Sequence, residues 1–542
     1  MKRLLFLGVL VMALYACNDA GKNYTYEEVE IDSTITVESS FNNLFLDSAA
    51  VEQYIGNDSS ATKYRAELLA FYTSRNFEYA WFDSNGVSEQ AHNFLNLART
   101  TAITQNDSTW IDAALEANIT QATTLGKTKK YLASNEYKVL STKAEIALTK
   151  YFFTYASKVF NGAEVDVTQL GWFIPRKKID VTNVLDSVLK TKSADAVINS
   201  LQSKQYTLLQ GFLEKFIRLR KQYNWDTDTI PSPVKPYKLG DSSHAIEAIK
   251  QRLFAYGDYT TDYFSPLYND TLFTAVKRFQ RRNGLEVDGA IGKKMVAQLN
   301  DSIDTKIRTL LINMERARWL PKVDDSVYIL VNIPEYKLHV FRNDTLYHTM
   351  NVIVGSEANN TVIFSGNLRY VVFSPYWNVP YSIVKKEIAP KLAKDPGYLA
   401  RNNYEVYGGK VGGLPQIRQK PGDNNALGHV KFLFPNTYNI YLHDTPNRNL
   451  FTSNKRNLSH GCVRVGEPKW LAQFLLRNDP VYTDSLISSS MGLTKEKWVT
   501  LRDPVKVVIT YFTAFVDTSG TLNFRKDIYG HDKKMAEKLF GK

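Results

Sequence analysis

The spacing of apolar residues divides the chain into a helical part and a strand-rich part. Between residues 61 and 235 apolar positions recur three and four residues apart, which is the spacing of amphipathic helices. Between residues 325 and 530, runs such as YILVNIP, KLHVF and RYVVFSPYWNVP are β-branched and aromatic and are separated by turn residues. We therefore predict an α+β multidomain protein, in which a helical scaffold domain (61–235) precedes a mostly β domain (325–530).

Residues 240–300, between these two parts, have the pattern of a compact three-helix unit. A linker rich in proline, IPSPVKP (230–236), precedes it. Gly257 is expected to end the first helix, and Asp270 to cap the second at its N-terminus. The expected core positions are Ile246, Ile249, Leu253, Phe273, Val276, Phe279, Met295 and Leu299.

The N-terminus has the pattern of a cleaved export signal. Two basic residues precede an uninterrupted apolar run of eleven residues, Leu4–Leu14, which is too short to span a bilayer. The string LYAC (14–17) resembles a bacterial lipobox, which implies that residues 1–16 are removed and that Cys17 is acylated. Ordinary cleavage near Ala16, leaving a free thiol, is the alternative.

Residues 17–60 are polar, with alternating Thr and Glu, and are predicted to be a lipidated tether. Several acyl chains on one residue give stable membrane anchoring, whereas one chain alone is marginal. We therefore expect an exported protein, anchored in the cell envelope of a Gram-negative-type bacterium and facing the periplasm. The pattern leaves open which of the two membranes holds the anchor.

Composition narrows the possible classes of protein. The chain has 542 residues, of which 44% are hydrophobic and 23% charged, so collagen-like, coiled-coil and wholly disordered classes are excluded. A formal net charge of +12 suits polyanionic surroundings and does not by itself indicate nucleic acid, which we do not expect as a partner. Two cysteines allow at most one disulfide, so the fold is not held together by disulfides.

The second cysteine, Cys462, lies in the string SHGCVRV (459–465), nineteen positions after His443. An imidazole can take the proton of a thiol and stabilise the nucleophilic thiolate. Gly461 permits a tight turn in which its N–H and that of Cys462 face a developing oxyanion. The residues alone leave three alternatives open: a buried structural cysteine, a zinc site that includes His460, and a core histidine satisfied by the backbone.

The motif HD(x)14SHGCVRV resembles the catalytic motif of the L,D-transpeptidases with a YkuD-like domain. The strings MERARWLP, YWNVPYSI, RQKPGDNNALGHVKF and YNIYLHDTP resemble the larger YcbB-like branch of that family. The string from YNDTLF to VAQLN (268–300) resembles the peptidoglycan-binding domain of cell-wall hydrolases. The resemblance implies the order helical scaffold, peptidoglycan-binding domain and catalytic β domain.

The resemblance also implies roles for individual residues. Cys462 would be the nucleophile and His443 its general base, with the imidazole oriented by the backbone carbonyl at Asp444. His460 and Gly461 would support the catalytic turn. The residues expected to bind substrate are Arg464, Trp377, Tyr381 and Asp444, although Arg464 could equally form an internal salt bridge and the aromatic pair could belong to a core.

The reaction implied by the resemblance is a 3→3 cross-link between two peptidoglycan stem peptides through a Cys thioester, without cofactor or metal. The expected partners are the stem peptides, the glycan and, through the anchor, a membrane; protein partners are not predicted. Two alternatives remain at this point: hydrolysis of the same thioester by water, and a non-catalytic lipoprotein that ties membrane to wall.

Residues 385–430 differ in composition from the rest of the β domain. They hold seven of the chain's 28 glycines, and their eight Lys or Arg against four Asp or Glu give a local charge of +4. Glycine of this density favours a soft backbone. Because the larger branch has a capping insertion at this place, we predict a lid over Cys462; an ordinary excursion packed on the β domain is the alternative.

Overall fold

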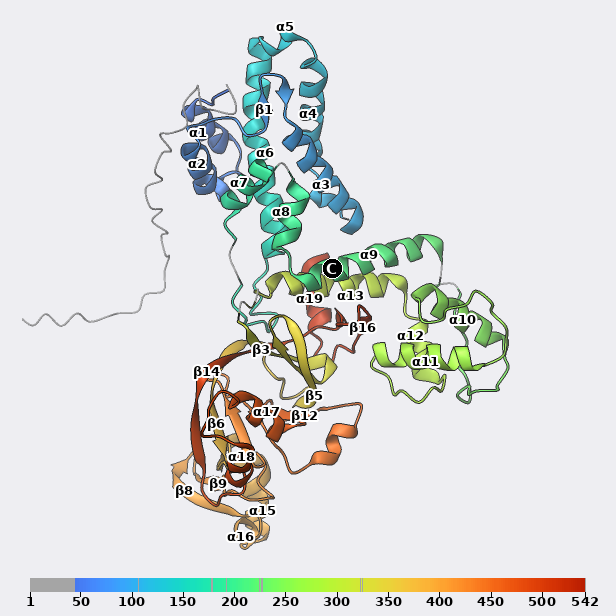
Figure 1. The fold of residues 1–542 in the computed structure, drawn as a ribbon, viewed down its shortest axis with the longest axis vertical. Coiled ribbons are helices and arrows are strands. Elements are labelled where there is room, and N and C mark those ends of the chain that lie inside the picture. Colours follow the sequence, from blue (N-terminus) through green and yellow to red (C-terminus); the bar gives the residue numbers. More distant parts are fainter. Residues whose placement is uncertain are drawn as a thin grey trace, which may run out of the picture. The chain divides into compact units, whose positions relative to one another are not determined.

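The computed structural model describes residues 44–105, 107–176, 179–191, 193–223, 225, 228–321, 323 and 325–541. The predicted signal peptide and Cys17 lie outside these residues. The described chain forms two compact units, one made of residues up to Ala91 with Ala114–Tyr151, and the other of His92–Ala113 with the chain from Phe152 onward. Figure 1 draws the elements of both.

The first unit is a helical bundle with a small hairpin, and its helices bury a carboxylic acid. Glu145 is fully buried and accepts hydrogen bonds from the backbone N–H groups of Ala80 and Trp81 at 2.7 and 2.9 Å. Burial raises the pKa of Glu145 to about 7. The elements of this unit are α1 (Ser48–Asn57), α2 (Arg65–Ser74), β1 (Phe82–Asp83), β2 (Gly86–Val87), α4 (Ala113–Leu125), α5 (Lys129–Leu132) and the first part of α6 (Asn135–Asn161).

The prediction of a tether is wrong for its described part, because helix α1 occupies most of residues 44–60. The Asp47 side chain accepts a hydrogen bond from the Ala49 N–H and caps the helix. Val51 and Ile55, one turn apart, are 0% and 3% exposed, so this helix is held by an apolar contact that the surrounding polar residues obscure in the sequence.

In the helical part of the second unit, two long helices, α9 and α13, pack against each other. The helices are α3 (Glu89–Gln105), α7 (Val181–Thr191), α8 (Ala194–Leu201), α9 (Lys204–Gln222), α10 (His244–Tyr256), α11 (Asp270–Arg282), α12 (Lys293–Leu299), α13 (Ile303–Trp319) and α19 (His531–Phe540). Residues of α9, α10, α11, α12 and α13 share one apolar core with the hairpin of β15 (Ala514–Val516) and β16 (Leu522–Phe524). The three-helix unit is therefore packed on its neighbours.

The three-helix unit has the predicted helices, with one difference at a cap. Gly257 ends α10 in the left-handed region, at φ 91°. The N-cap of α11 is Asn269, whose side chain accepts from the Leu272 N–H at 3.0 Å, rather than the predicted Asp270. Gly289, at φ 74°, lies so close to Phe273 that a Cβ there would come within 2.2 Å of the ring, so the turn requires glycine.

The strand-rich part of the second unit is one nine-stranded sheet that closes on itself. Its order is β12-β5-β13-β11-β10-β6-β14-β3-β4, and β5 also pairs with β4. The strands are β3 (Val327–Asn332), β4 (Lys337–Arg342), β5 (Thr345–Gly355), β6 (Ser365–Phe373), β10 (Val430–Leu433), β11 (Leu442–His443), β12 (Asn457–Ser459), β13 (Val463–Val465) and β14 (Lys497–Thr510). Helices α17 (Pro468–Leu475) and α18 (Asp484–Ser490) contribute to its apolar core.

The glycine-rich segment 385–430 forms, together with residues 377–384, a folded subdomain at one end of this sheet (Figure 1). Its strands β7 (Trp377–Asn378), β8 (Tyr404–Val411) and β9 (Leu414–Gln419) form a separate antiparallel sheet. Short helical turns, α14 (Tyr381–Ile383), η4 (Val384–Ile388), α15 (Ala389–Lys394) and α16 (Tyr398–Arg401), complete it. Val384, Ile388 and Ile417 form a small core of its own, and the softness expected of this backbone stays a prediction.

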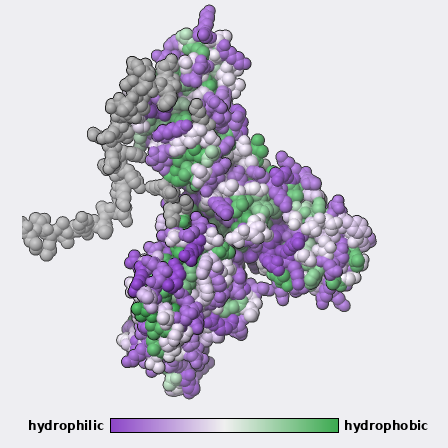
Figure 2. Space-filling view, in the orientation of Figure 1, coloured by the Kyte–Doolittle hydropathy of each residue, from purple (hydrophilic) through white to green (hydrophobic). Residues whose placement is uncertain are grey.

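The face of the molecule in Figure 2 is mostly hydrophilic, with hydrophobic residues in small groups. Scattered apolar side chains of this kind are usual on a solvent-exposed protein surface. Among the described residues, no helix has both the length and the apolar character needed to cross a bilayer.

Candidate active site

Two short parallel strands, β11 and β13, carry the predicted catalytic residues. Leu442 pairs with Val463 and His443 with Arg464. Leu442, Val463 and Val465 are fully buried in the core of the sheet. Because side chains alternate along a strand, His443 and Arg464 point to the opposite face, together with the residue that precedes β13, Cys462.

The imidazole of His443 is held by the chain next to it. Its Nδ1 lies 2.5 Å from the backbone oxygen of Asp444, and because a carbonyl oxygen only accepts, Nδ1 carries the hydrogen and Nε2 the lone pair. Burial and the positive charge of Arg464 lower the pKa of His443, while the hydrogen bond to Asp444 raises it. The net result is a pKa of about 3. The ring is therefore a neutral base with a free acceptor nitrogen.

The thiol of Cys462 is half-buried, and its partners come from the chain that leads into β11. Its Sγ lies 3.5 Å from the backbone oxygen of Asn439, a residue at φ 56°. Burial raises the pKa of Cys462, while hydrogen bonds with Tyr441 and the charge of Arg464 act in the opposite direction. The ring of Tyr441 meets that of His443 edge-on, with centroids 5.6 Å apart. Tyr441 thus contacts both the predicted nucleophile and the predicted base.

The turn before Cys462 is fixed by side-chain hydroxyls. Gly461 has φ 119°, which a residue with a Cβ rarely adopts. The hydroxyl of Ser459 donates to the Cys462 oxygen at 2.5 Å, and that of Thr361 donates to the Gly461 oxygen at 2.7 Å. The N–H of Gly461 donates to Ser459 Oγ at 3.2 Å, so this group is not the free oxyanion donor that we predicted.

The side chain of His460 contacts the subdomain that contains residues 385–430. Its Nε2 lies 3.1 Å from Oε1 of Glu387, which belongs to the subdomain of residues 385–430, and both side chains are about half exposed. No group of three His, Cys, Asp or Glu in the described part of the chain is arranged to hold a metal ion. The zinc alternative for His443, His460 and Cys462 therefore has no support from the geometry.

Arg464 is a cation without a carboxylate partner among the described residues. Its Nε is buried and makes no hydrogen bond. The titratable group that interacts with it is Cys462, which raises the pKa of the guanidinium. Burial lowers the pKa of its guanidinium. The alternative of an internal salt bridge is therefore not what the structure shows, and the guanidinium stays available to an anion beside the thiol.

The remaining predicted substrate-binding residues have structural partners. Asp444 is 2% exposed, and its carboxylate accepts a hydrogen bond from the His429 N–H at 2.9 Å. Its side chain is therefore unavailable to substrate, contrary to our prediction. Trp377 pairs with Gln419 in the small sheet, with its ring 6.3 Å from that of Tyr404. Tyr381 is 41% exposed, and its hydroxyl donates to the Gly412 oxygen at 3.2 Å. Both rings thus belong to the subdomain beside the site.

Three residues of the site were missed in the sequence analysis: Asn439, Tyr441 and Thr361. Asn439 and Tyr441 stand in the string NIYLHD that contains His443, and an Asn after a turn is a common left-handed position, so a signal was present. Thr361 has none, because it lies 100 positions from Gly461 and meets it only through the folded sheet.

Three family models match parts of this chain. A model of the L,D-transpeptidase catalytic domain (YkuD) matches residues 326–483, and a model of a scaffold domain matches residues 66–213. A third, described as "Putative peptidoglycan binding domain", matches residues 242–299. The first of these ranges contains β11, β13 and the turn between them.

Individual relatives were also found. A Haemophilus influenzae protein named "Putative L,D-transpeptidase" is 33% identical over 241 residues, which are 42% of this chain and 48% of that protein. The chain thus spans about half the length of this curated relative. A crystal structure of an L,D-transpeptidase from Xylanimonas cellulosilytica is 15% identical and covers 52% of this chain and 100% of its own, at a TM-score of 0.17. One from Stackebrandtia nassauensis is 14% identical and covers 52% of this chain and 97% of its own, at a TM-score of 0.21. Overlap at these scores is too slight to support an argument.

Proposed function

We propose that this chain, which contains an L,D-transpeptidase catalytic domain together with a peptidoglycan-binding domain, forms 3→3 cross-links between peptidoglycan stem peptides. The observation that carries the proposal is the placement of the Cys462 thiol and the His443 imidazole on one face of two paired strands, both in contact with Tyr441. A nucleophile and a base in this relation are what covalent acyl transfer requires.

In the first step, Cys462 Sγ attacks the carbonyl carbon between the third residue of a tetrapeptide stem, a diamino acid, and its terminal D-Ala. Nε2 of His443 takes the thiol proton as the C–S bond forms. The C–N bond then breaks, and D-Ala leaves as an amine with the proton from His443. Because burial and Arg464 disfavour the imidazolium, the proton is readily passed on to the leaving group.

In the second step, the side-chain amine of a diamino acid on another stem attacks the thioester. His443 takes a proton from the attacking amine and returns it to the Cys462 sulfur as the C–S bond breaks. A new amide and the free thiol result, so no oxidant, reductant or cofactor is consumed. Division into two acyl transfers replaces one difficult exchange by two easier ones.

Arg464 suits the substrate class in this proposal. Stem peptides carry carboxylates, and the Arg464 guanidinium, whose Nε is buried, has no protein carboxylate to pair with among the described residues. A guanidinium recognises a carboxylate through two parallel N–H···O bonds. Such a pair would fix the scissile carbonyl relative to Cys462.

We also propose that the protein acts at the envelope, with Cys17 acylated and the peptidoglycan-binding domain on the wall. Neither the predicted lipoprotein signal nor Cys17 lies among the described residues, so this part depends on the sequence alone. Attachment at two points would raise the local concentration of stem peptides without new contacts at the active site. The check is palmitate labelling of cells that carry wild type or Cys17→Ala; equal labelling would contradict acylation at Cys17.

The transpeptidase proposal is tested with purified disaccharide-tetrapeptide and mass spectrometry. Wild type should release D-Ala and form dimers, whereas Cys462→Ala should remain folded and do neither. Dimers formed by Cys462→Ala would overturn the assignment of the nucleophile. Release of D-Ala by wild type without any dimer would instead identify water as the acceptor and favour hydrolysis.

A further inference from the structure

The helical scaffold domain contributes a segment to the core of the catalytic sheet. Leu170, Trp172 and Ile174 are at most 5% exposed and belong to the same apolar core as the strands of the sheet. Trp172 forms a parallel bridge with Ile363, and the Phe173 N–H donates to the Ile363 oxygen at 2.8 Å. We call residues 165–174 the strap. The match to the scaffold-domain model includes the strap, although the strap packs as part of the catalytic domain.

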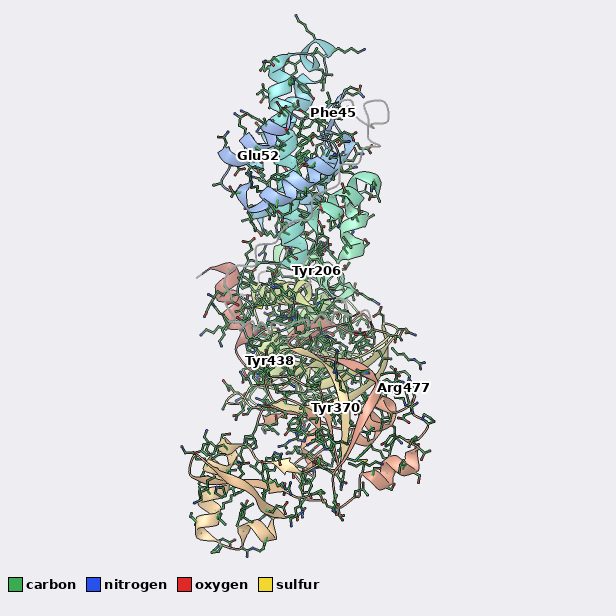
Figure 3. The ribbon with its side chains drawn as sticks, turned by 90° about the vertical axis from the view of Figure 1, so that its left-hand side faces the viewer. Phe45, Glu52, Tyr206, Tyr370, Tyr438 and Arg477 are labelled. Atoms are coloured by element: carbon green, nitrogen blue, oxygen red, sulfur yellow. The ribbon has the colours of Figure 1, made fainter. Side chains whose placement is uncertain are left out.

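One residue of the strap lies beside the loop that leads to the catalytic base. The ring of Phe173 is 5.3 Å from that of Tyr438, which is labelled in Figure 3, and the ring of Phe364 is 5.0 Å from Tyr438. Phe173 and Tyr438 are each 37% exposed. The pair therefore lies at the surface, where it adds little to the core.

The loop that carries Tyr438 is closed by hydrogen bonds and ends at the thiol. The Asn436 side chain donates to the Phe434 and Ile440 oxygens at 2.6 and 2.8 Å and accepts from the Tyr438 N–H at 3.0 Å. The next residue, Asn439, has φ 56°, and its oxygen accepts from Cys462 Sγ at 3.5 Å. A displacement of Tyr438 would therefore move the acceptor of the nucleophilic thiol.

We propose that Phe173 is a positioning residue of the active site: through Tyr438 it fixes the Asn439 oxygen against Cys462 and so orients the thiol for attack. The inference rests on the proposed function for its activity readout. It makes the scaffold domain a component of the catalytic site, in addition to any role as a spacer between wall and membrane.

Two measurements should both decrease in Phe173→Ala. Acylation of Cys462 by a carbapenem, followed by intact mass, should slow about three- to tenfold, the range for loss of one aromatic pair. The midpoint of the pH profile of iodoacetamide alkylation should fall, because a thiol that donates to a carbonyl is held neutral and loses that support in the variant. Exposure of the thiol by partial unfolding would lower the midpoint as well, because burial raises the pKa of Cys462, so both measurements are made on variants that keep the wild-type unfolding temperature.

Phe254→Ala is the matched control. Phe254 is 40% exposed and forms an aromatic pair with Phe264, with ring centroids 5.6 Å apart, in the three-helix unit. Phe254→Ala should leave the acylation rate and the alkylation midpoint at their wild-type values. Phe173→Tyr, which keeps an aromatic ring, should also give wild-type values of both. If Phe173→Ala lowers the unfolding temperature, Phe173→Leu, which keeps apolar bulk without the ring, is measured in its place.

The inference is overturned if either measurement stays at the wild-type value in Phe173→Ala, or if Phe254→Ala reproduces both changes. Failure of the proposed function has a different signature. In that case wild-type Cys462 forms no carbapenem adduct, while the alkylation profile of Phe173→Ala still reports whether the strap positions the thiol.

Discussion

Arg448 holds the carboxylate of Asp444, the residue whose backbone oxygen orients the imidazole of His443. Its Nη2 lies 2.7 Å from Asp444 Oδ1, and its Nη1 donates to the Gly466 oxygen at 2.8 Å. Asp444 follows β11 and Gly466 follows β13, so one guanidinium ties the strand of the base to the strand of the nucleophile. The carboxylate is buried while Arg448 is half exposed.

We expect Arg448→Ala to slow carbapenem acylation about tenfold or more and to lower the free energy of unfolding by about 1–3 kcal/mol, the range for loss of a hydrogen bond to a buried charged group. Arg448→Lys should recover part of both, because one donor can still reach Asp444. The control is Arg502→Ala, which removes a similar exposed arginine from its pair with Asp479 on the same domain. Equal losses in the two alanine variants would contradict a specific role of Arg448.

The low pKa of His443 gives a pH dependence with a definite sign. The unfolded imidazole binds a proton near pH 6.5, whereas the folded one remains neutral to about pH 3. Between these values the unfolded state binds more protons, so stability is lost as the pH falls from 6.5, by about 2 kcal/mol at pH 5. Denaturant unfolding of His443→Gln should lack this part of the loss; an unchanged pH dependence would contradict it.

The same neutrality predicts an activity profile. His443 of the unacylated enzyme does not gain a proton near pH 6.5. As the pH is lowered, the rate of carbapenem acylation should therefore not fall with an apparent pKa of about 6.5. Acylation of the wild type is measured from pH 5 to 8, with thiol alkylation as a reference for enzyme integrity. A loss of most of the rate between pH 7 and 5 would show that His443 titrates normally.

Arg464→Gln should weaken cross-linking mainly through the KM for the donor stem, by about 10- to 100-fold, since a charge-assisted bidentate pair would be lost. Arg464→Lys should restore little, because an ammonium does not reproduce the planar fork. Steady-state kinetics with the tetrapeptide stem and with its carboxamide analogue test whether Arg464 binds the carboxylate of the stem. If the amide lowers the efficiency of wild type and of Arg464→Gln equally, Arg464 does not bind that carboxylate.

The role of the 385–430 subdomain as a lid stays a prediction. The structure adds one contact to it, between Glu387 and His460 next to the nucleophile. Limited proteolysis should cut the exposed turn near Gly412 and Gly413 in the free enzyme and spare it in the carbapenem adduct. Identical cleavage in both states, or no effect of Glu387→Gln on the ratio of hydrolysis to transfer, would contradict a lid.

The sequence predicted the elements whose signals are local. The helix C-cap at Gly257 follows from residues adjacent in the chain, and the catalytic motif names Cys462 and His443. The α+β architecture and the identification of an L,D-transpeptidase catalytic domain with a peptidoglycan-binding domain are confirmed. The catalytic roles of the two motif residues stay predictions until the variants are measured.

The errors arose where a residue's partner is distant or hidden. The α1 helix depends on Val51 and Ile55, whose helical spacing is a weak signal because the stretch around them is mostly polar. Closure of the sheet and entry of Trp172 into its core join segments far apart in the chain. The Gly461 N–H was assigned to an oxyanion because the motif does not show that Ser459 Oγ already accepts it.

The irregular pairing of β8 bears on the solubility of the protein in a crowded compartment. Among the described residues the strand pairs with β9 alone, and its register shifts twice, between Val406 and Gly408 and between Gly408 and Lys410. Shifts of this kind bend the backbone, so the free amide and carbonyl groups along the edge do not form a straight row. A lysine on such an edge further opposes the addition of a strand from another molecule. A long exposed edge in the insertion is thereby protected against intermolecular sheet growth.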